Sequence, residues 1–206
     1  MYKDASELMS QCKEQNKRIW QIAVENEMKL TSSSYEDILS RFDDRLEIMF
    51  HSAQKALNAK QATKGGLIDG VAKTQYDYSK KENISGEYIN YVMSLAYSCS
   101  EVNASMGKIC ASPTAGSCGI VPAVLLGLSQ AKNISREKTL EGLITASAVG
   151  AIYTKNATVA GADGGCQAEC GVARSMAAAA AAYMMGADDD KCLDAAGFAM
   201  INIMGL

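Results

Sequence analysis

Residues 34–57 read SYEDILSRFDDRLEIMFHSAQKAL, and this stretch shows the helical pattern of the chain most clearly. Ser34, followed three residues later by Asp37, resembles a capping box, the side-chain pattern that begins an α-helix. After it, apolar residues recur every three or four positions, the spacing of one helical face: Tyr35, Ile38, Phe42, Leu46, Met49, Phe50, Ala53 and Leu57. The stretch therefore predicts a long amphipathic helix.

The same spacing continues in both directions along the chain. It predicts one N-terminal helix carrying Leu8, Cys12, Ile19, Ile22 and Ala23 on one face, and further helices near 71, over about 86–105, from about 120 and after Ser135. An Ala-rich helix is expected from about Cys166 to Met185, with a last helix beginning near Asp188. Strand patterns are almost absent. We therefore expect an all-α fold, a multi-helix bundle formed by residues 1–206 as a single domain.

Composition and charge limit the function classes. Of the 206 residues, 48% are hydrophobic and 21% are charged, which excludes a disordered chain. The net charge of −3 leaves no positive surplus for a nucleic-acid backbone or an anionic membrane, so neither is expected as a partner. The 7 cysteines and the charged segment after Met1 predict a reducing, cytoplasmic location without a disulfide framework.

An uncharged stretch covers 109–131, which is long enough to consider a membrane span. We reject this interpretation because Ser112, Pro113, Thr114, Ser117 and Pro122 gather in its first half, where their polar groups would lack partners in lipid. The stretch instead predicts a buried loop that leads into a helix from about Ile120.

Two glycine-containing segments each precede a predicted helix, SPTAGSCG over 112–119 and GADGGCQAE over 161–169. Backbone N–H groups at helix N-termini suit an anion such as a carboxylate, so both loops are candidates for the active-site region. The spacing alone leaves a second interpretation open, in which the glycines only permit tight connections between packed helices.

Few residues in the second half could carry chemistry. Cys166 is expected near a helix N-terminus, where the metal-binding thiolate is favoured, and Cys170 shares its helical face. The other five cysteines and His51 are expected to be structural. Four sparse charges stand in this neutral region, Lys155, Asp163, Glu169 and Arg174, and each needs either an ion-pair partner or a catalytic role.

Three motifs in order carry a family resemblance: NASMG over 103–107, SPTAGS over 112–117 and GGCQAE over 164–169, followed by the Ala-rich run. Together they resemble the α subunit of the iron–sulfur-dependent L-serine dehydratases across most of the chain. The resemblance implies a helical catalytic domain that holds a [4Fe-4S] cluster with three cysteines. By this resemblance one iron would act as a Lewis acid on the hydroxyl of L-serine, and elimination of water would give aminoacrylate, which is hydrolysed to pyruvate and ammonia.

The resemblance also implies roles for residues and partners. Cys166 matches the first cluster ligand, and in the family the other two follow a segment like 203–206, so we expect a C-terminally truncated α domain that is inactive alone. A β-type subunit or domain and an oligomer are implied. The implied site residues are Ser112, Thr114, Gly116 and Asn156 for substrate binding, with Lys155, Asp163 and Glu169 as candidates for a catalytic base that the motifs do not assign.

The sequence departs from the family pattern at three places. The stretch over 65–70 reads GGLIDG where the family tends to show a Thr-Gly-Gly-Asp-like run, so a substrate contact from this loop stays open. Cys118 and Cys170 replace apolar or small residues and are either accidental or replacement ligands. The alternative function is a helical structural or metal-binding module that keeps the fold and lacks the reaction.

Overall fold

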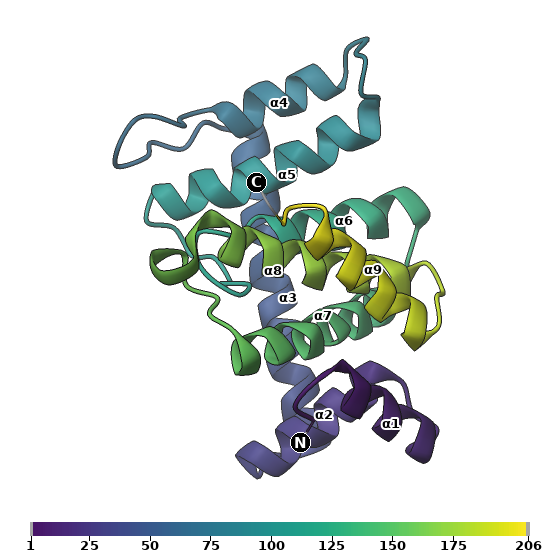
Figure 1. Cartoon of the computed structure of the whole chain (residues 1–206). Coiled ribbons are helices and arrows are strands. Elements are labelled where there is room, and N and C mark those ends of the chain that lie inside the picture. Colours follow the sequence, from purple (N-terminus) through teal and green to yellow (C-terminus); the bar gives the residue numbers. More distant parts are fainter. Residues whose placement is uncertain (1, 205–206) are drawn as a thin grey trace.

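A computed structural model describes residues 2–204, and this part of the chain forms nine α-helices and no strand (Figure 1). The helices are α1 (Ala5–Gln15), α2 (Ile19–Thr31), α3 (Tyr35–Asn58), α4 (Val71–Ser79), α5 (Glu87–Ala104), α6 (Ile120–Lys132), α7 (Arg136–Asn156), α8 (Gly161–Met184) and α9 (Asp189–Ile201). The predicted all-α fold is confirmed. Among residues 2–204, none of the helices combines the length and the apolar character that crossing a membrane requires.

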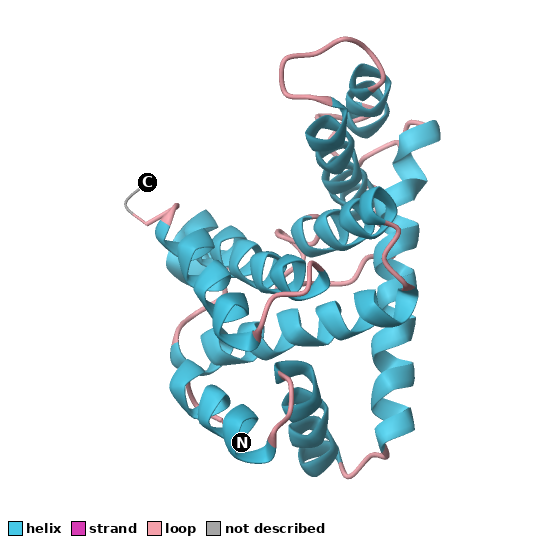
Figure 2. Cartoon of the chain, turned by 90° about the vertical axis from the view of Figure 1, so that its right-hand side faces the viewer, coloured by secondary structure: helices cyan, strands magenta, loops and turns pink. Residues whose placement is uncertain are grey.

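Helix α3 is the long helix that runs along the height of the molecule (Figure 2). It begins with the predicted capping box, in which the Ser34 hydroxyl accepts from the Asp37 N–H and the Asp37 carboxylate accepts from the Ser34 N–H. Its apolar face contacts α5, α6, α7 and α2. The long helix expected from the sequence is therefore present and packs against helices from both halves of the chain.

The Ala-rich helix α8 packs most extensively against α7 and α9. Small residues let the helices approach closely, because a Cβ at Gly142 or at Gly150 of α7 would lie 2.9 Å or 3.0 Å from atoms of Met184 and Met176. The main hydrophobic core lies around this contact and extends to Val121 and Leu125 of α6. The Ala-rich segment therefore occupies the interior, as its composition predicts.

The prediction of a single N-terminal helix is wrong. The chain breaks at Asn16, whose φ of 50° is left-handed, so Leu8 and Cys12 belong to α1 whereas Ile19 and Ile22 belong to α2. Asparagine tolerates this conformation better than most residues, and the Asn16 N–H donates back to the Lys13 carbonyl, which ends α1. All four apolar residues are nevertheless buried.

The second glycine-containing segment, over 161–169, was expected to begin as a loop but lies within a helix. Helix α8 begins at Gly161 rather than near Cys166, and only 157–160 lie between α7 and α8. The Asp163 and Gly164 N–H groups both donate to the Ala160 carbonyl and form a helical turn. Gly165 then interrupts the helix with φ 71° and ψ −174°, a conformation that glycine adopts at low cost. Cys166 is thus the first residue after a kink.

Several predicted boundaries are confirmed. The segment over 65–70 lies outside the helices, Ser135 and Asp188 accept hydrogen bonds from the first turns of α7 and α9, and α8 ends just before Gly186, whose φ is 90°. The stretch before Ile120 is a loop, as expected, but it is only partly buried, because Ala111, Ala115 and Gly116 are exposed. Two of the three family motifs lie at helix ends: NASMG over 103–107 at the end of α5, and SPTAGS over 112–117 before the start of α6.

Candidate functional site

The loop that precedes α6 meets the beginning of α8 at Glu169. The Thr114 hydroxyl donates to Oε1 of Glu169 over 2.8 Å, although 55 residues separate the two positions. A contact of 3.2 Å joins the Thr114 and Ser117 hydroxyls, and Ser117 donates to the Ser112 carbonyl. Hydrogen bonds within the loop therefore stabilise its conformation, and one hydrogen bond to the Glu169 carboxylate connects it to α8.

Two glycines allow the Glu169 carboxylate to occupy this position. A Cβ at Gly116 would lie 2.8 Å from Oε2 of Glu169, and a Cβ at Gly161 would lie 2.6 Å from the same atom. A Cβ atom essentially never lies this close to an atom to which it is not bonded, so a side chain at either glycine would displace the carboxylate. We call the group formed by Thr114, Gly116, Gly161 and Glu169 the loop junction. It brings the two glycine-containing segments together.

Two thiols lie beside the loop junction on α8. The Sγ atoms of Cys166 and Cys170 are 3.5 Å apart, with Cys166 exposed and Cys170 half-buried. Burial and the neighbouring Cys166 thiol both raise the pKa of Cys170. Because residues three and four apart share a helical face, Glu169 lies on the same side of α8 as Cys166. Residues 2–204 contain no group of three or more side chains placed to hold a metal ion.

Three other predicted site residues form hydrogen bonds outside the loop junction. The Asn156 amide donates to the Lys3 and Ile152 carbonyls over 2.7 Å and 2.8 Å, and the Lys155 ammonium donates to the Tyr2 carbonyl. Asp163 accepts from the Thr158 hydroxyl. Within the described part of the chain, Lys155, Asp163, Glu169 and Arg174 form no ion pair. Lys155, Asp163 and Arg174 are exposed to solvent, so the expectation that each of them needs an ion-pair partner or a catalytic role is wrong, and only Glu169 is half-buried.

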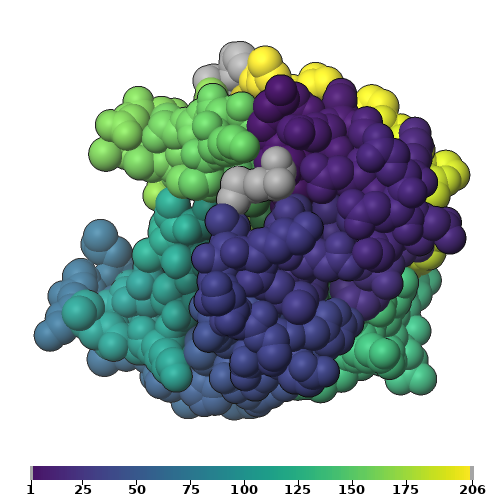
Figure 3. Space-filling view, turned by 90° about the horizontal axis from the view of Figure 1, so that it is seen from below, coloured from purple at the N-terminus to yellow at the C-terminus, as the bar shows by residue number. Residues whose placement is uncertain are grey.

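A cavity of about 700 Å³ lies between α2, α3, α7 and the segment over 110–113. In Figure 3 the surface is hollowed where the green segment at the start of α8 approaches the purple and blue surface of α2 and α3. Ser112 and Lys155 line this cavity, whereas Thr114, Gly116, Asn156 and Cys166 do not. The predicted substrate-binding residues therefore lie in three places. Ser112 lines the cavity, Thr114 and Gly116 belong to the loop junction, and Asn156 contacts the N-terminal segment.

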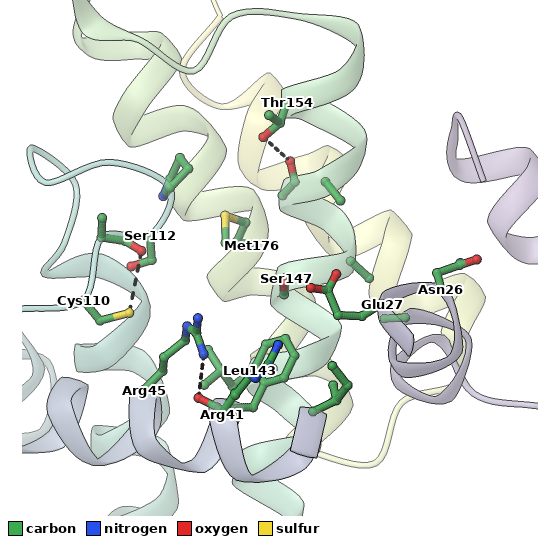
Figure 4. Close-up of a pocket in the computed structure, with 18 of the residues that line it drawn as sticks. Asn26, Glu27, Arg41, Arg45, Cys110, Ser112, Leu143, Ser147, Thr154 and Met176 are labelled. Carbon is green, nitrogen blue, oxygen red and sulfur yellow. Dashed lines mark hydrogen bonds between the residues drawn. The ribbon is translucent and has the colours of Figure 1, made fainter. Parts of the chain in front are cut away.

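Sequence reasoning missed three charged residues that line the cavity: Glu27, Arg41 and Arg45. Figure 4 shows the Arg45 guanidinium rising from α3 towards Cys110 and Ser112, while the Glu27 carboxylate enters from α2 on the other side. The spacing of Arg41 and Arg45 places both on one face of α3, but a charged helical face normally indicates contact with solvent. The sequence holds no signal that this face borders a cavity.

Glu101, which lies outside the cavity lining, is a fourth charged residue that sequence reasoning missed. Its side chain is fully buried, and its carboxylate accepts from the N–H groups of Gln61, Gly70 and Ala72 over 2.7 Å, 2.9 Å and 3.2 Å. Two residues later, the Asn103 amide donates to the Ala115 carbonyl. The end of α5 therefore holds both the segment over 61–70 and the loop of the loop junction.

Four of the remaining five cysteines are buried, as expected of small hydrophobic residues. Cys12, Cys99, Cys118 and Cys192 are buried, and burial raises the pKa of Cys99 to about 12, so these thiols remain protonated at neutral pH. Cys110 is half-buried. His51 is exposed on α3. None of these residues lies in the loop junction.

Comparison with known proteins identifies the family. The model of the family described as "Serine dehydratase alpha chain" matches residues 14–206. Over the whole chain, 42% of residues are identical to the "L-serine dehydratase, alpha chain" of Peptoniphilus asaccharolyticus, of which 71% is covered. The "Probable L-serine dehydratase, alpha chain" of Bacillus subtilis is 36% identical with 69% covered, and "L-serine dehydratase 1" of Escherichia coli is 31% identical with 46% covered. The chain belongs to the serine dehydratase alpha chain family.

Proposed function

We propose that this chain is the α-type subunit of an L-serine dehydratase, which eliminates water from L-serine to give pyruvate and ammonia. Relatives named as L-serine dehydratases align with the entire chain, and they do not favour an inactive structural module. The observation that carries the proposal is the Glu169 carboxylate, which lies between the two glycine-containing segments and accepts from Thr114. A β-type partner, an oligomer and a cytoplasmic location belong to the same proposal, as does a role in serine degradation.

Elimination from serine needs a base that removes the α-proton while the hydroxyl leaves. Of the three candidates, Glu169 suits this step best because its carboxylate lies against Gly116 of the loop before α6, whereas Lys155 donates to the Tyr2 carbonyl and Asp163 accepts from Thr158. The Thr114 hydroxyl holds one oxygen of Glu169 and leaves the other, Oε2, facing the two glycines. We assign Glu169 the role of the base and Thr114 the role of orienting it.

Substrate binding is proposed at the loop that precedes α6. Ser112, Thr114 and Gly116 belong to this loop, whose N–H groups lie before the N-terminus of α6, where the helix dipole favours a carboxylate. Asn156 is the weakest member of the proposed set, because its amide donates to two carbonyls of the protein itself. The serine carboxylate would therefore face the loop while its Cα–H faces Glu169.

The family implies an iron–sulfur cluster, and the described residues supply only part of a site for it. Cys166 is exposed at the kink of α8 and Cys170 lies beside it, whereas a [4Fe-4S] cluster of this type needs three thiolates. Over residues 2–204 the side chains do not form the complete ligand set. We propose Cys166 as one ligand and derive no step of the reaction through the cluster.

The proposed activity is tested by pyruvate release from L-serine. The chain is produced anaerobically together with the β-type chain of the same organism, and its iron and sulfide are reconstituted with an added thiol that can complete the coordination. Pyruvate is then measured with lactate dehydrogenase. We expect pyruvate and ammonia in equal amounts, and the same rate from a Glu82→Gln variant, because Glu82 is exposed in a loop away from the loop junction. A folded, iron-containing complex that releases no pyruvate would contradict the proposal.

A further inference from the structure

The cavity between α2, α3 and α7 has an apolar interior. Its walls include Met49 of α3, Leu143 of α7 and Met176 of α8, all of which are buried, together with the half-buried Phe42. The volume of about 700 Å³ lies within the range of small-molecule sites, which are mostly apolar with a few polar groups that fix the ligand.

Two opposite charges reach the cavity from different helices (Figure 4). Arg45 extends from α3 and donates to the Arg41 carbonyl over 2.8 Å. Glu27 extends from α2 towards Ser147. Neither side chain is in an ion pair with any residue that the structure describes. Arg41 and Lys155 also line the cavity, so it offers more than one positive group and a single carboxylate, that of Glu27, to a ligand.

A buried hydroxyl without a partner is the second observation that indicates a ligand. Ser112 is 4% exposed and lines the cavity, and its Oγ has no hydrogen-bond partner among residues 2–204. Nδ2 of Asn26, another buried residue of the cavity wall, is also without a partner within this part of the chain. Buried polar groups without partners are uncommon and costly, because they lose hydrogen bonds to water. A polar ligand in the cavity would satisfy the Ser112 hydroxyl.

We propose that this cavity binds a free α-amino acid with an apolar side chain. The ligand carboxylate pairs with Arg45 and accepts from the Ser112 hydroxyl, the ammonium group pairs with Glu27, and the side chain packs against Met49, Leu143 and Met176. A zwitterion is the chemistry that uses both charges at once, and the apolar walls select a side chain larger than that of serine. The cavity shares Ser112 with the proposed serine-binding loop, but Thr114, Gly116 and Glu169 do not line it, so the site goes beyond the proposed function.

Isothermal titration calorimetry of the full chain with L-leucine as the probe tests the proposal. We expect L-leucine to bind at least tenfold more tightly than L-serine, because each buried methylene favours binding roughly fourfold. 4-Methylpentanoate lacks the ammonium group and 3-methylbutylamine lacks the carboxylate, so each should bind at least tenfold more weakly than L-leucine. The readout is independent of serine turnover, so failure here leaves the proposed dehydratase activity in place.

Variants of residues inside and outside the cavity test whether L-leucine binds in the cavity. Arg45→Gln and Glu27→Gln should each weaken L-leucine binding at least tenfold, while Arg174→Gln and Glu82→Gln, which change charges outside the cavity, should leave it within twofold. Circular dichroism verifies that each variant is folded. The proposal is overturned if L-leucine does not bind, if L-serine or 4-methylpentanoate binds equally well, or if Arg45→Gln and Glu27→Gln bind L-leucine like the unsubstituted chain.

Discussion

Glu169→Gln is expected to lower kcat/KM for L-serine by about 100-fold or more, because it removes the proposed base while keeping the size of the side chain. The amide oxygen of the glutamine can still accept from Thr114, so the loop junction should keep its geometry. Asp163→Asn and Lys155→Gln serve as matched controls among the candidate bases. Both residues are hydrogen-bonded elsewhere, and we expect changes of less than about threefold for each.

A double-variant cycle separates the role of Thr114 from that of Glu169. Thr114→Val removes the donor to Glu169 and should lower kcat/KM by about tenfold. Thr114→Ser keeps a hydroxyl donor and should keep most of the unsubstituted kcat/KM. If Thr114 acts by orienting Glu169, the double variant is no slower than Glu169→Gln alone, because interacting positions are not additive. A Glu169→Gln enzyme within threefold of the unsubstituted rate would remove Glu169 as the base, and fully additive effects would show that Thr114 does not act through Glu169.

Glu101→Ala is expected to lower the free energy of unfolding by about 3 kcal/mol, since it leaves N–H groups without an acceptor at a buried position. Three backbone N–H groups, those of Gln61, Gly70 and Ala72, lose their common partner. Glu101→Gln keeps one acceptor oxygen and should lose about half as much. Urea denaturation at neutral pH measures both differences.

Two controls make the Glu101 prediction specific. Glu82→Ala changes an exposed loop carboxylate and should stay within about 0.5 kcal/mol of the unsubstituted chain. Limited trypsin digestion should cut faster after Lys60 and Lys64 in Glu101→Ala, because the segment over 61–70 loses the contact that holds it to α5. Equal stability of the Glu101→Ala and Glu82→Ala variants would show that this carboxylate does not anchor the segment.

The helices could be predicted because their signals are local. Ser34, Asp37 and the apolar repeat after them are sufficient to define α3, and Ser135 and Asp188 mark helix starts by their side chains alone. The break at Asn16 could not be predicted in this way. Cys12 and Ile19 are seven residues apart, which fits one continuous helix as well as two helices that bury the same face.

The candidate site was predictable only in part, because its contacts are long-range. The sequence singled out Thr114, Gly116 and Glu169 separately, but their contact depends on how α8 packs beside the loop before α6. It placed Asn156 with them, whereas the fold directs its amide to the N-terminal segment. Glu101 has the charge of a surface residue, and only the packing of α5 shows that it is buried.

We place the reactive centre where the straight part of α8 begins, with Cys166 as a metal ligand one turn from Glu169. The kink at Gly165 leaves the Cys166 thiol exposed, and Cys170 lies 3.5 Å from it. Thiolates are the ligands that iron–sulfur clusters require. If Cys166 is a ligand, its removal should abolish iron binding, whereas removal of a cysteine away from α8 should not.

The most direct test of Cys166 as a metal ligand is to measure the iron and acid-labile sulfide bound per chain. The chain is first reconstituted anaerobically with an added thiol that can complete the coordination. We predict that the unsubstituted chain and Cys110→Ala retain iron and sulfide, and that Cys166→Ala falls to background. Cys170→Ala shows in parallel whether the second thiol contributes. Iron retained by Cys166→Ala at the level of the unsubstituted chain, or no iron retained by any of these proteins, would contradict the assignment of Cys166.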